Sequence, residues 1–223
     1  MGWLRQLHSV LWKELLVEWR TRAALGAMGV FGALVLLLFH FAFPPENRNI
    51  AYLTPGVMWI AFLFSLLLGL NRTMSRERDN GCMEAQLLAP VDRTALFLAK
   101  FLSNFLFLSL LQGWMMAVFA LFFSLAPADV FNFGLVALLG NVGLVTVGTL
   151  FSAMAVQTQL AEVLLTLMMV PLTLPVLIGA VKGTAATLVG DPVGTSFWLD
   201  LLLGCDALYL IMGLVLYSSV VEE

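Results

Sequence analysis

Few residues in this chain have side chains suited to chemistry. Histidine occurs twice, at His8 and His40, and cysteine twice, at Cys82 and Cys205. Neither histidine lies in a metal-binding spacing such as H-E-x-x-H, and the cysteines form no CxxC pair, so we expect no zinc site and no structural disulfide. The sequence also lacks the G-x-x-x-x-G-K-[ST] phosphate loop. We therefore expect no ATP hydrolysis, no catalytic residue and no bound metal or cofactor in this chain alone.

Two side chains leave an alternative open. His40 lies between Phe39 and Phe41 near the end of the first hydrophobic segment. Haem iron is often held by histidine, so an axial ligand is one interpretation, and an ordinary interfacial histidine is the favoured one. Asp206 lies deep in the last hydrophobic segment, where a charge costs roughly 2.5 to 3.5 kcal/mol at the bilayer centre. Asp206 needs a partner at that depth. A role in a proton or cation relay is the less favoured interpretation of this residue.

The one long polar interruption of the hydrophobic sequence is residues 72–93. Charges packed this densely between two membrane segments cannot lie in hydrocarbon, so the stretch faces water. Arg76 to Asp79 is expected to end a helix that projects from the preceding span, and Asn80-Gly81 indicates a turn. Cys82 to Leu88 then predicts a short amphipathic helix that stops before Pro90.

This short helix is best interpreted as a docking element. Met83 and Leu87 are four residues apart and share one face, and Glu84 and Leu88 share the next. Such a stub fits a groove of another protein better than it folds alone, although a solvated loop that only fixes topology is the alternative. The predicted docking residues are Glu77, Arg78, Asp79, Gly81, Met83, Glu84, Leu87 and Leu88.

The composition is that of a membrane protein. Of the 223 residues, 61% are hydrophobic and 11% are charged, and mean hydropathy is +0.97. Soluble domains carry about 25% charged residues, so this chain is integral to a membrane. At about 20 residues per crossing, we expect an all-α, polytopic fold in one transmembrane domain, residues 1–223. The net charge of −3 argues against a nucleic-acid partner.

The hydrophobic pattern predicts six transmembrane helices. They are expected at residues 23–43, 51–70, 96–125, 133–156, 163–181 and 199–220.

Three of these segments have further features. The fourth is rich in small residues, including Gly140, Gly143 and Gly148, which predicts close helix packing. The fifth contains Pro171 and Pro175, which predict a kinked or broken helix. Residues 182–198, rich in Gly, Pro and Thr, are expected to form a partial re-entrant element or a short surface helix.

Residues 1–22 predict an amphipathic interfacial helix. Leu4, Leu7, Leu11 and Leu15 share one face of it, and several basic residues lie on another. We expect this helix to lie along the membrane surface, and the alternative is that it extends the first span into the cytoplasm.

The distribution of basic residues predicts the orientation. Nine of the eleven Lys and Arg residues fall on one side of the membrane if the N-terminus is cytoplasmic; only Arg48 and Lys182 fall on the other. Basic residues concentrate on the cytoplasmic side, so both termini and the loop 72–93 are expected there.

The loop 72–93 resembles a known element. The run from Glu77 through Glu84 to Leu88 and Pro90 is similar to the cytoplasmic loop of exporter-type ABC permeases, with Cys82 where Ser or Thr is usual. In that class of protein, the loop forms a coupling helix that docks on the ATPase subunit. The resemblance implies the same role here.

Three further stretches narrow the resemblance to the CcmB family. Lys13-Glu14-Leu15 with Glu18, Arg20 and Arg22 is similar to the family's N-terminal K-[DE]-L-x-x-E-x-R-x-R signature. Pro55-Gly56-Val57-Met58-Trp59 resembles its P-G-[IV]-x-W sequence at the start of the second span, and residues 171–177 resemble its P-L-x-[IL]-P-[LV]-L run. The length and the order of the motifs also agree.

The resemblance implies a function in cytochrome c biogenesis. It implies a multi-pass subunit of the bacterial cytoplasmic (inner) membrane, working with an ATPase (CcmA), two membrane partners (CcmC and CcmD) and, indirectly, a haem chaperone (CcmE). ATP hydrolysis by the partner would drive haem export or release of the haem-loaded chaperone at the outer face. Two ATPase subunits would need two docking stubs, so two copies are expected.

Two other functions remain open on the residues alone. One is an exporter permease for a lipid, a drug or another amphipathic substrate, and the other is a passive assembly scaffold. The residues do not settle whether haem passes through the chain, and the absence of a cluster of axial ligands in the sequence favours a mechanical role.

Overall fold

The computed structural model describes residues 3–20, 22–43, 50–79, 92–123, 127–156 and 161–220. These residues form helices α1 (Trp3–Arg20), α2 (Arg22–Ala42), α3 (Ile50–Asp79), α5 (Arg93–Phe123), α6 (Val130–Val156), α7 (Ala161–Val189) and α8 (Pro192–Val220). The predicted all-α fold is confirmed.

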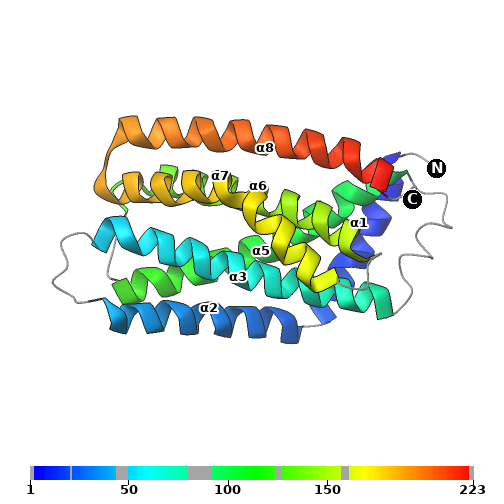
Figure 1. Ribbon diagram of the computed structural model, residues 1–223, viewed down its shortest axis with the longest axis horizontal. Helices are drawn as coiled ribbons and strands as arrows, with labels where there is room; N and C mark the ends of the chain where they lie inside the picture. Colours follow the sequence, from blue (N-terminus) through cyan, green and yellow to red (C-terminus); the bar gives the residue numbers. More distant parts are fainter. Residues whose placement is uncertain are drawn as a thin grey trace.

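Six of the helices are long and apolar enough to cross a membrane, which confirms the predicted number of spans. They lie lengthwise beside one another, and the two ends of the chain are found at the same end of the bundle (Figure 1). Helix α1 crosses that end at a steep angle to α2 (Figure 1) and packs against α5. The N-terminal residues therefore form a separate helix and do not continue the first span.

Helix α3 lies at the centre of the core. The side chains of Trp59 and Leu66 are fully buried, and α3 packs against α2, α5, α6 and α7. The Trp59 indole Nε1–H donates to the Thr184 hydroxyl of α7 at 3.0 Å, and the Ser65 hydroxyl donates to the Met28 carbonyl of α2 at 3.2 Å. Since no water is available in hydrocarbon to replace these bonds, they fix α3 relative to both neighbours.

The glycines of α6 allow close helix contacts, as the sequence predicts. A Cβ atom at Gly140 would lie 2.9 Å from Trp59 Cζ3 of α3, and one at Gly148 would lie 2.5 Å from Leu70 Cδ1, also of α3. At Gly143 it would meet α7 and α8. Gly134 is different, because nothing lies within 4 Å of the added atom.

Helix α7 is continuous through Pro171 and Pro175. The oblique yellow beginning of α7 and its later part differ in direction in Figure 1. Each proline removes an amide donor from the helix and crowds the preceding turn, which accounts for a bend at this point. The predicted kink is therefore present, and the helix is not broken.

The expectation for residues 182–198 is wrong. Instead of a re-entrant element or a surface helix, α7 continues to Val189 and α8 begins at Pro192. Gly190, at φ 77°, ends α7, and its N–H donates to the Ala186 carbonyl at 2.9 Å. Glycine is favoured here because it adopts the left-handed conformation without the cost of a Cβ atom. The two spans are thus joined by a very short turn.

Candidate functional site

The end of the bundle that carries the chain termini is the candidate site, because α3 projects there. The hydrophobic part of α3 reaches Thr73, and the helix continues to Asp79. Six further residues add about 9 Å at 1.5 Å per residue. Glu77, Arg78 and Asp79 form the last turn of this extension, as the sequence predicts.

The remaining predicted docking residues are not part of the described structure. Gly81, Met83, Glu84, Leu87 and Leu88 all lie outside the described residues, as does Cys82. Their docking role and the short amphipathic helix therefore remain predictions. What the structure places is the pair of helices on either side, α3 before this stretch and α5 after it.

Asp92 caps the start of α5. One carboxylate oxygen, Oδ1, accepts hydrogen bonds from the Thr94 N–H at 2.9 Å and from the Thr94 hydroxyl at 2.6 Å. These bonds, first that from the Thr94 side chain and then that from its backbone, lower the pKa of Asp92 below its usual value. An acidic N-cap also complements the positive end of the helix dipole. The position where the chain re-enters the membrane is therefore defined by an exposed carboxylate.

Sequence reasoning missed Asp92, although a signal was present. Aspartate directly before a long apolar helix is a common N-cap pattern. What the sequence alone does not show is that the Gln6 side-chain oxygen accepts the Asp92 backbone N–H at 3.4 Å. This bond joins α1 to the start of α5.

Helix α1 is placed by its leucine face. Leu7, Leu11 and Leu15 are half-buried, whereas Arg5 and Lys13 are exposed. The half-buried face is directed towards α5, against which the helix packs. That α1 is amphipathic and lies along the membrane surface stays a prediction.

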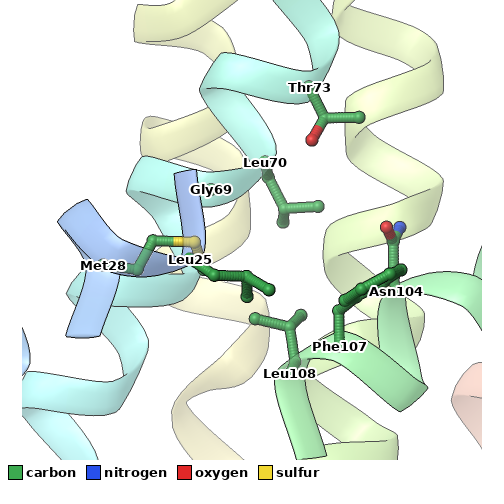
Figure 2. A pocket seen from close by; sticks show the side chains of 8 residues that line it. All are labelled: Leu25, Met28, Gly69, Leu70, Thr73, Asn104, Phe107 and Leu108. Carbon is green, nitrogen blue, oxygen red and sulfur yellow. The ribbon is translucent and has the colours of Figure 1, made fainter. Parts of the chain in front are cut away.

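Two adjoining clefts lie near the same end, one between α2, α3 and α5 and the other between α1, α3, α5 and α6. The apolar cleft is lined by Leu25, Met28, Gly69, Leu70, Thr73, Asn104, Phe107 and Leu108 (Figure 2). The polar cleft shares Leu70, Thr73 and Asn104 with it and adds Glu14, Lys100, Ser103 and Ser152.

The two clefts are small. Each leaves about 20 Å³ for the centre of a water molecule. That is room for about one water, so neither cleft accepts a porphyrin in this conformation. Within the polar cleft, Lys100 is 8% exposed and Glu14 is half-buried, so one potential charge of each sign borders the same small space.

His40 lies among aromatic rings. Its imidazole stacks on Phe122 with ring centroids 5.6 Å apart, and it meets Phe41 and Phe123 edge-on at the same separation. Among the described residues, no three His, Cys, Asp or Glu side chains are grouped so as to hold a metal ion. The environment of His40 in the structure is therefore one of aromatic packing.

The acidic residues of the last span differ sharply in burial. Asp200 is exposed, whereas Asp206 is 4% exposed, and neither carboxylate oxygen of Asp206 has a hydrogen-bond partner within the described part of the chain. The adjacent Cys205 is a free thiol. Asp206 is therefore the buried acid that the sequence singles out, and the structure provides no partner for it there.

Comparison with known proteins assigns the family. The CcmB protein family matches residues 5–220. Heme exporter protein B of Pseudomonas aeruginosa is 34% identical over 191 residues, which cover 85% of this chain and 86% of the relative. The proteins of the same name from Haemophilus influenzae and Paracoccus denitrificans are 30% and 27% identical, over 83% and 84% of this chain and 84% and 86% of theirs. The chain therefore belongs to the CcmB family.

Proposed function

We propose that this chain transmits the work of ATP hydrolysis by a separate ATPase subunit to the outer face of the membrane. Family membership makes it the membrane component of a cytochrome c maturation ABC transporter, a permease subunit without an ATPase domain of its own. Its curated relatives are named as haem exporters. The transmitted work drives haem export or release of a haem-loaded chaperone.

The continuity of α3 is the observation that carries this proposal. The helix runs unbroken for 30 residues from Ile50 to the projecting turn at Asp79. Pro55 is the sixth residue of the helix, and the helix continues through it. Along its length α3 is joined to α2 through Ser65 and to α7 through Trp59. A push or pull on the last turn is therefore delivered to the core of the bundle and to its far end.

The residues that receive the push are proposed to be those around the projecting turn. Glu77, Arg78 and Asp79 would offer charges to the ATPase surface, and Gly81 would provide the turn. Met83, Glu84, Leu87 and Leu88 would then form the short coupling helix that occupies the ATPase groove. These eight residues lie together in the sequence, at and just after the end of α3, which extends past its span.

The surroundings of the chain follow from the same proposal. The termini and the loop 72–93 face the cytoplasm, and α1 lies along the inner surface of the bacterial cytoplasmic membrane. Residues 1–223 act as one transmembrane domain, in two copies per complex, so that each ATPase subunit has one docking stub. The partners are the ATPase CcmA and the membrane proteins CcmC and CcmD, with the haem chaperone CcmE acting indirectly.

The small size of the two clefts favours a mechanical role over a conduit. Room for about one water molecule in each leaves no path for a porphyrin through either of them in this conformation. We therefore propose that the chain acts by transmitting movement, and that haem does not pass through either of these two clefts.

Charge reversal tests the docking proposal. In the double variant Asp79→Lys with Glu84→Lys, we expect loss of co-purification with the ATPase subunit and at least a tenfold fall in covalent haem in membranes. The reason is that both substitutions replace an acidic contact with a repulsive one. Co-purification and haem staining of a deletion strain complemented with each variant would measure this.

The matched control is Glu46→Lys, which reverses an acid that lies between α2 and α3 in the sequence. It should leave ATPase association and haem staining unchanged. If the double variant retained both at wild-type level, the loop would not be the coupling element.

A further inference from the structure

Asp206 lies near the middle of the last candidate span. The last span covers Pro192–Tyr217, and Asp206 is fourteen residues from its start and eleven from its end. At 1.5 Å per residue, about 21 Å and 17 Å of helix separate it from the two ends. Its side chain is 4% exposed, and both carboxylate oxygens are buried without a hydrogen-bond partner in the described residues.

The carboxyl group occupies a space that a glycine provides. A Cβ atom at Gly143 of α6 would lie 2.5 Å from Asp206 Oδ1 and 2.8 Å from Val176 Cγ2 of α7. Any side chain at position 143 would therefore collide with the acid or with α7. The group is enclosed where α6, α7 and α8 pack together.

No cation faces this position from the neighbouring helices. Helix α6 carries no ionisable residue between Val130 and Val156. The only cation of α7 is Lys182, which is exposed and lies six residues beyond Val176, about 9 Å along the axis. The cations of α5 are Arg93 and Lys100, both within its first eight residues. Helix α5 begins at the end of the bundle that carries the termini (Figure 1).

The other titratable groups nearby are on α8 itself. Cys205 is the adjacent residue, and Asp200 is exposed. Tyr209 lies almost one turn further along, and its hydroxyl donates to the Leu172 carbonyl of α7 at 2.7 Å. The hydroxyl proton of Tyr209 therefore takes part in a hydrogen bond between α8 and α7. None of these groups supplies a positive charge.

We propose that Asp206 is a mid-membrane proton-binding site, whose carboxyl group is held as the neutral acid while α6, α7 and α8 are packed around it. An ionised carboxylate without a partner costs several kcal/mol in such surroundings, whereas a neutral carboxyl costs far less. Ionisation then requires water or a cation to reach the group, which means that α8 moves away from Gly143. This site is independent of the docking loop and of which substrate the complex serves.

Infrared spectroscopy tests the protonation directly. The complete chain, purified with its partner subunits in lipid nanodiscs, would be measured at neutral pH. We expect the carbonyl stretch of a protonated carboxyl group, separate from the carboxylate bands, to be present in the wild type and lost in Asp206→Asn. Because the group is enclosed, the band should shift only slowly after transfer to heavy water.

The matched control is Asp200→Asn, which removes an exposed acid from the same helix and should retain the band. Isotopically labelled aspartate in the wild-type chain makes the same measurement without a variant, should Asp206→Asn fail to fold. A labelled wild-type sample that shows only carboxylate bands at neutral pH would overturn the proposal, since Asp206 would then be ionised and paired.

Discussion

At the scale of single residues, polar atoms fix the positions of the spans. The Trp59 ring is fully buried, and its one donor is bonded to Thr184, 125 residues later in the chain. In hydrocarbon, an unpaired indole N–H would have no water to bind. The partner of Trp59 could not be predicted from the sequence, because several threonines follow it and only the packing of α3 on α7 selects one.

Asp92 leads to a prediction about acid. The hydrogen bonds from Thr94 lower the pKa of Asp92, so its stabilisation of α5 is fully present above the unfolded value of about 3.9. It is lost as the pH falls through the lower folded value. We expect the amides of the first turn of α5 to lose protection several-fold over that range, as measured by hydrogen exchange corrected for intrinsic rates.

The variant Asp92→Asn separates this effect from general acid unfolding. Asparagine still accepts a bond at the cap but does not titrate, so the protection of the first turn should no longer follow pH in this range. Equal pH dependence in the variant and the wild type would show that the Asp92 carboxylate does not stabilise the helix start.

At the scale of elements, α6 offers faces of small residues against which other helices pack closely. Its glycines meet Trp59 and Leu70 of α3, Val176 of α7 and Asp206 of α8. The absence of a charged residue along α6 allows all of these contacts to be dry. Helix α6 therefore determines how closely its neighbours approach.

The substitution Gly140→Ala should destabilise the bundle. The added Cβ would lie 2.9 Å from Trp59 Cζ3 and 3.1 Å from the Cβ of Ala180, and the indole is too buried to move freely. Overpacking of this kind costs about 1 to 3 kcal/mol. The measurement is thermal unfolding of the purified protein in detergent, followed by circular dichroism.

Gly134→Ala is the control for this prediction, because nothing lies within 4 Å of the added atom in the same helix. Alanine is also the better helix former, so this variant should be neutral or slightly more stable. The close-packing explanation fails if the two variants unfold at the same temperature.

The sequence predicts elements well where apolar runs are long, and poorly where polar residues are buried inside a helix. The six spans follow from hydropathy alone. The composition of residues 182–198 indicated a surface segment, yet Thr184 and Thr187 are buried in α7. The Thr187 hydroxyl donates to the Thr184 carbonyl at 2.8 Å, and the Thr184 hydroxyl accepts from Trp59. Threonines with such partners do not end a membrane helix.

The candidate site could likewise be predicted only in part. The projecting turn with Glu77, Arg78 and Asp79 is predicted by charge that cannot enter hydrocarbon, which is local information. The bond between Gln6 and Asp92 joins residues 86 positions apart, and the glycine space around Asp206 needs three helices. No periodicity in one segment contains that information.

At the scale of the whole molecule, the arrangement of the ends leads to a prediction of orientation. The two ends of the chain lie at one end of the bundle (Figure 1). Most basic residues belong to sequence segments that are expected on that same side of the membrane. We expect a fluorescent protein fused after Glu223 to fluoresce, and alkaline phosphatase fused there to be inactive, because both report a cytoplasmic location.

Fusions after Arg48, which follows the first span, should give the opposite pair of results. Fluorescence from both fusion points would contradict the assigned crossing between them. Active phosphatase after Glu223 would instead place the C-terminus outside and reverse the whole topology.

The short turn between α7 and α8 also has a consequence for biogenesis. Only Gly190 and Asp191 separate Val189 from Pro192, so the two spans form a helical hairpin. With the termini cytoplasmic, as we propose, Asp191 is the one charge of the turn itself that the translocation machinery must move across the bilayer. Helices α7 and α8 thus have the form of a unit that can be inserted into the bilayer together.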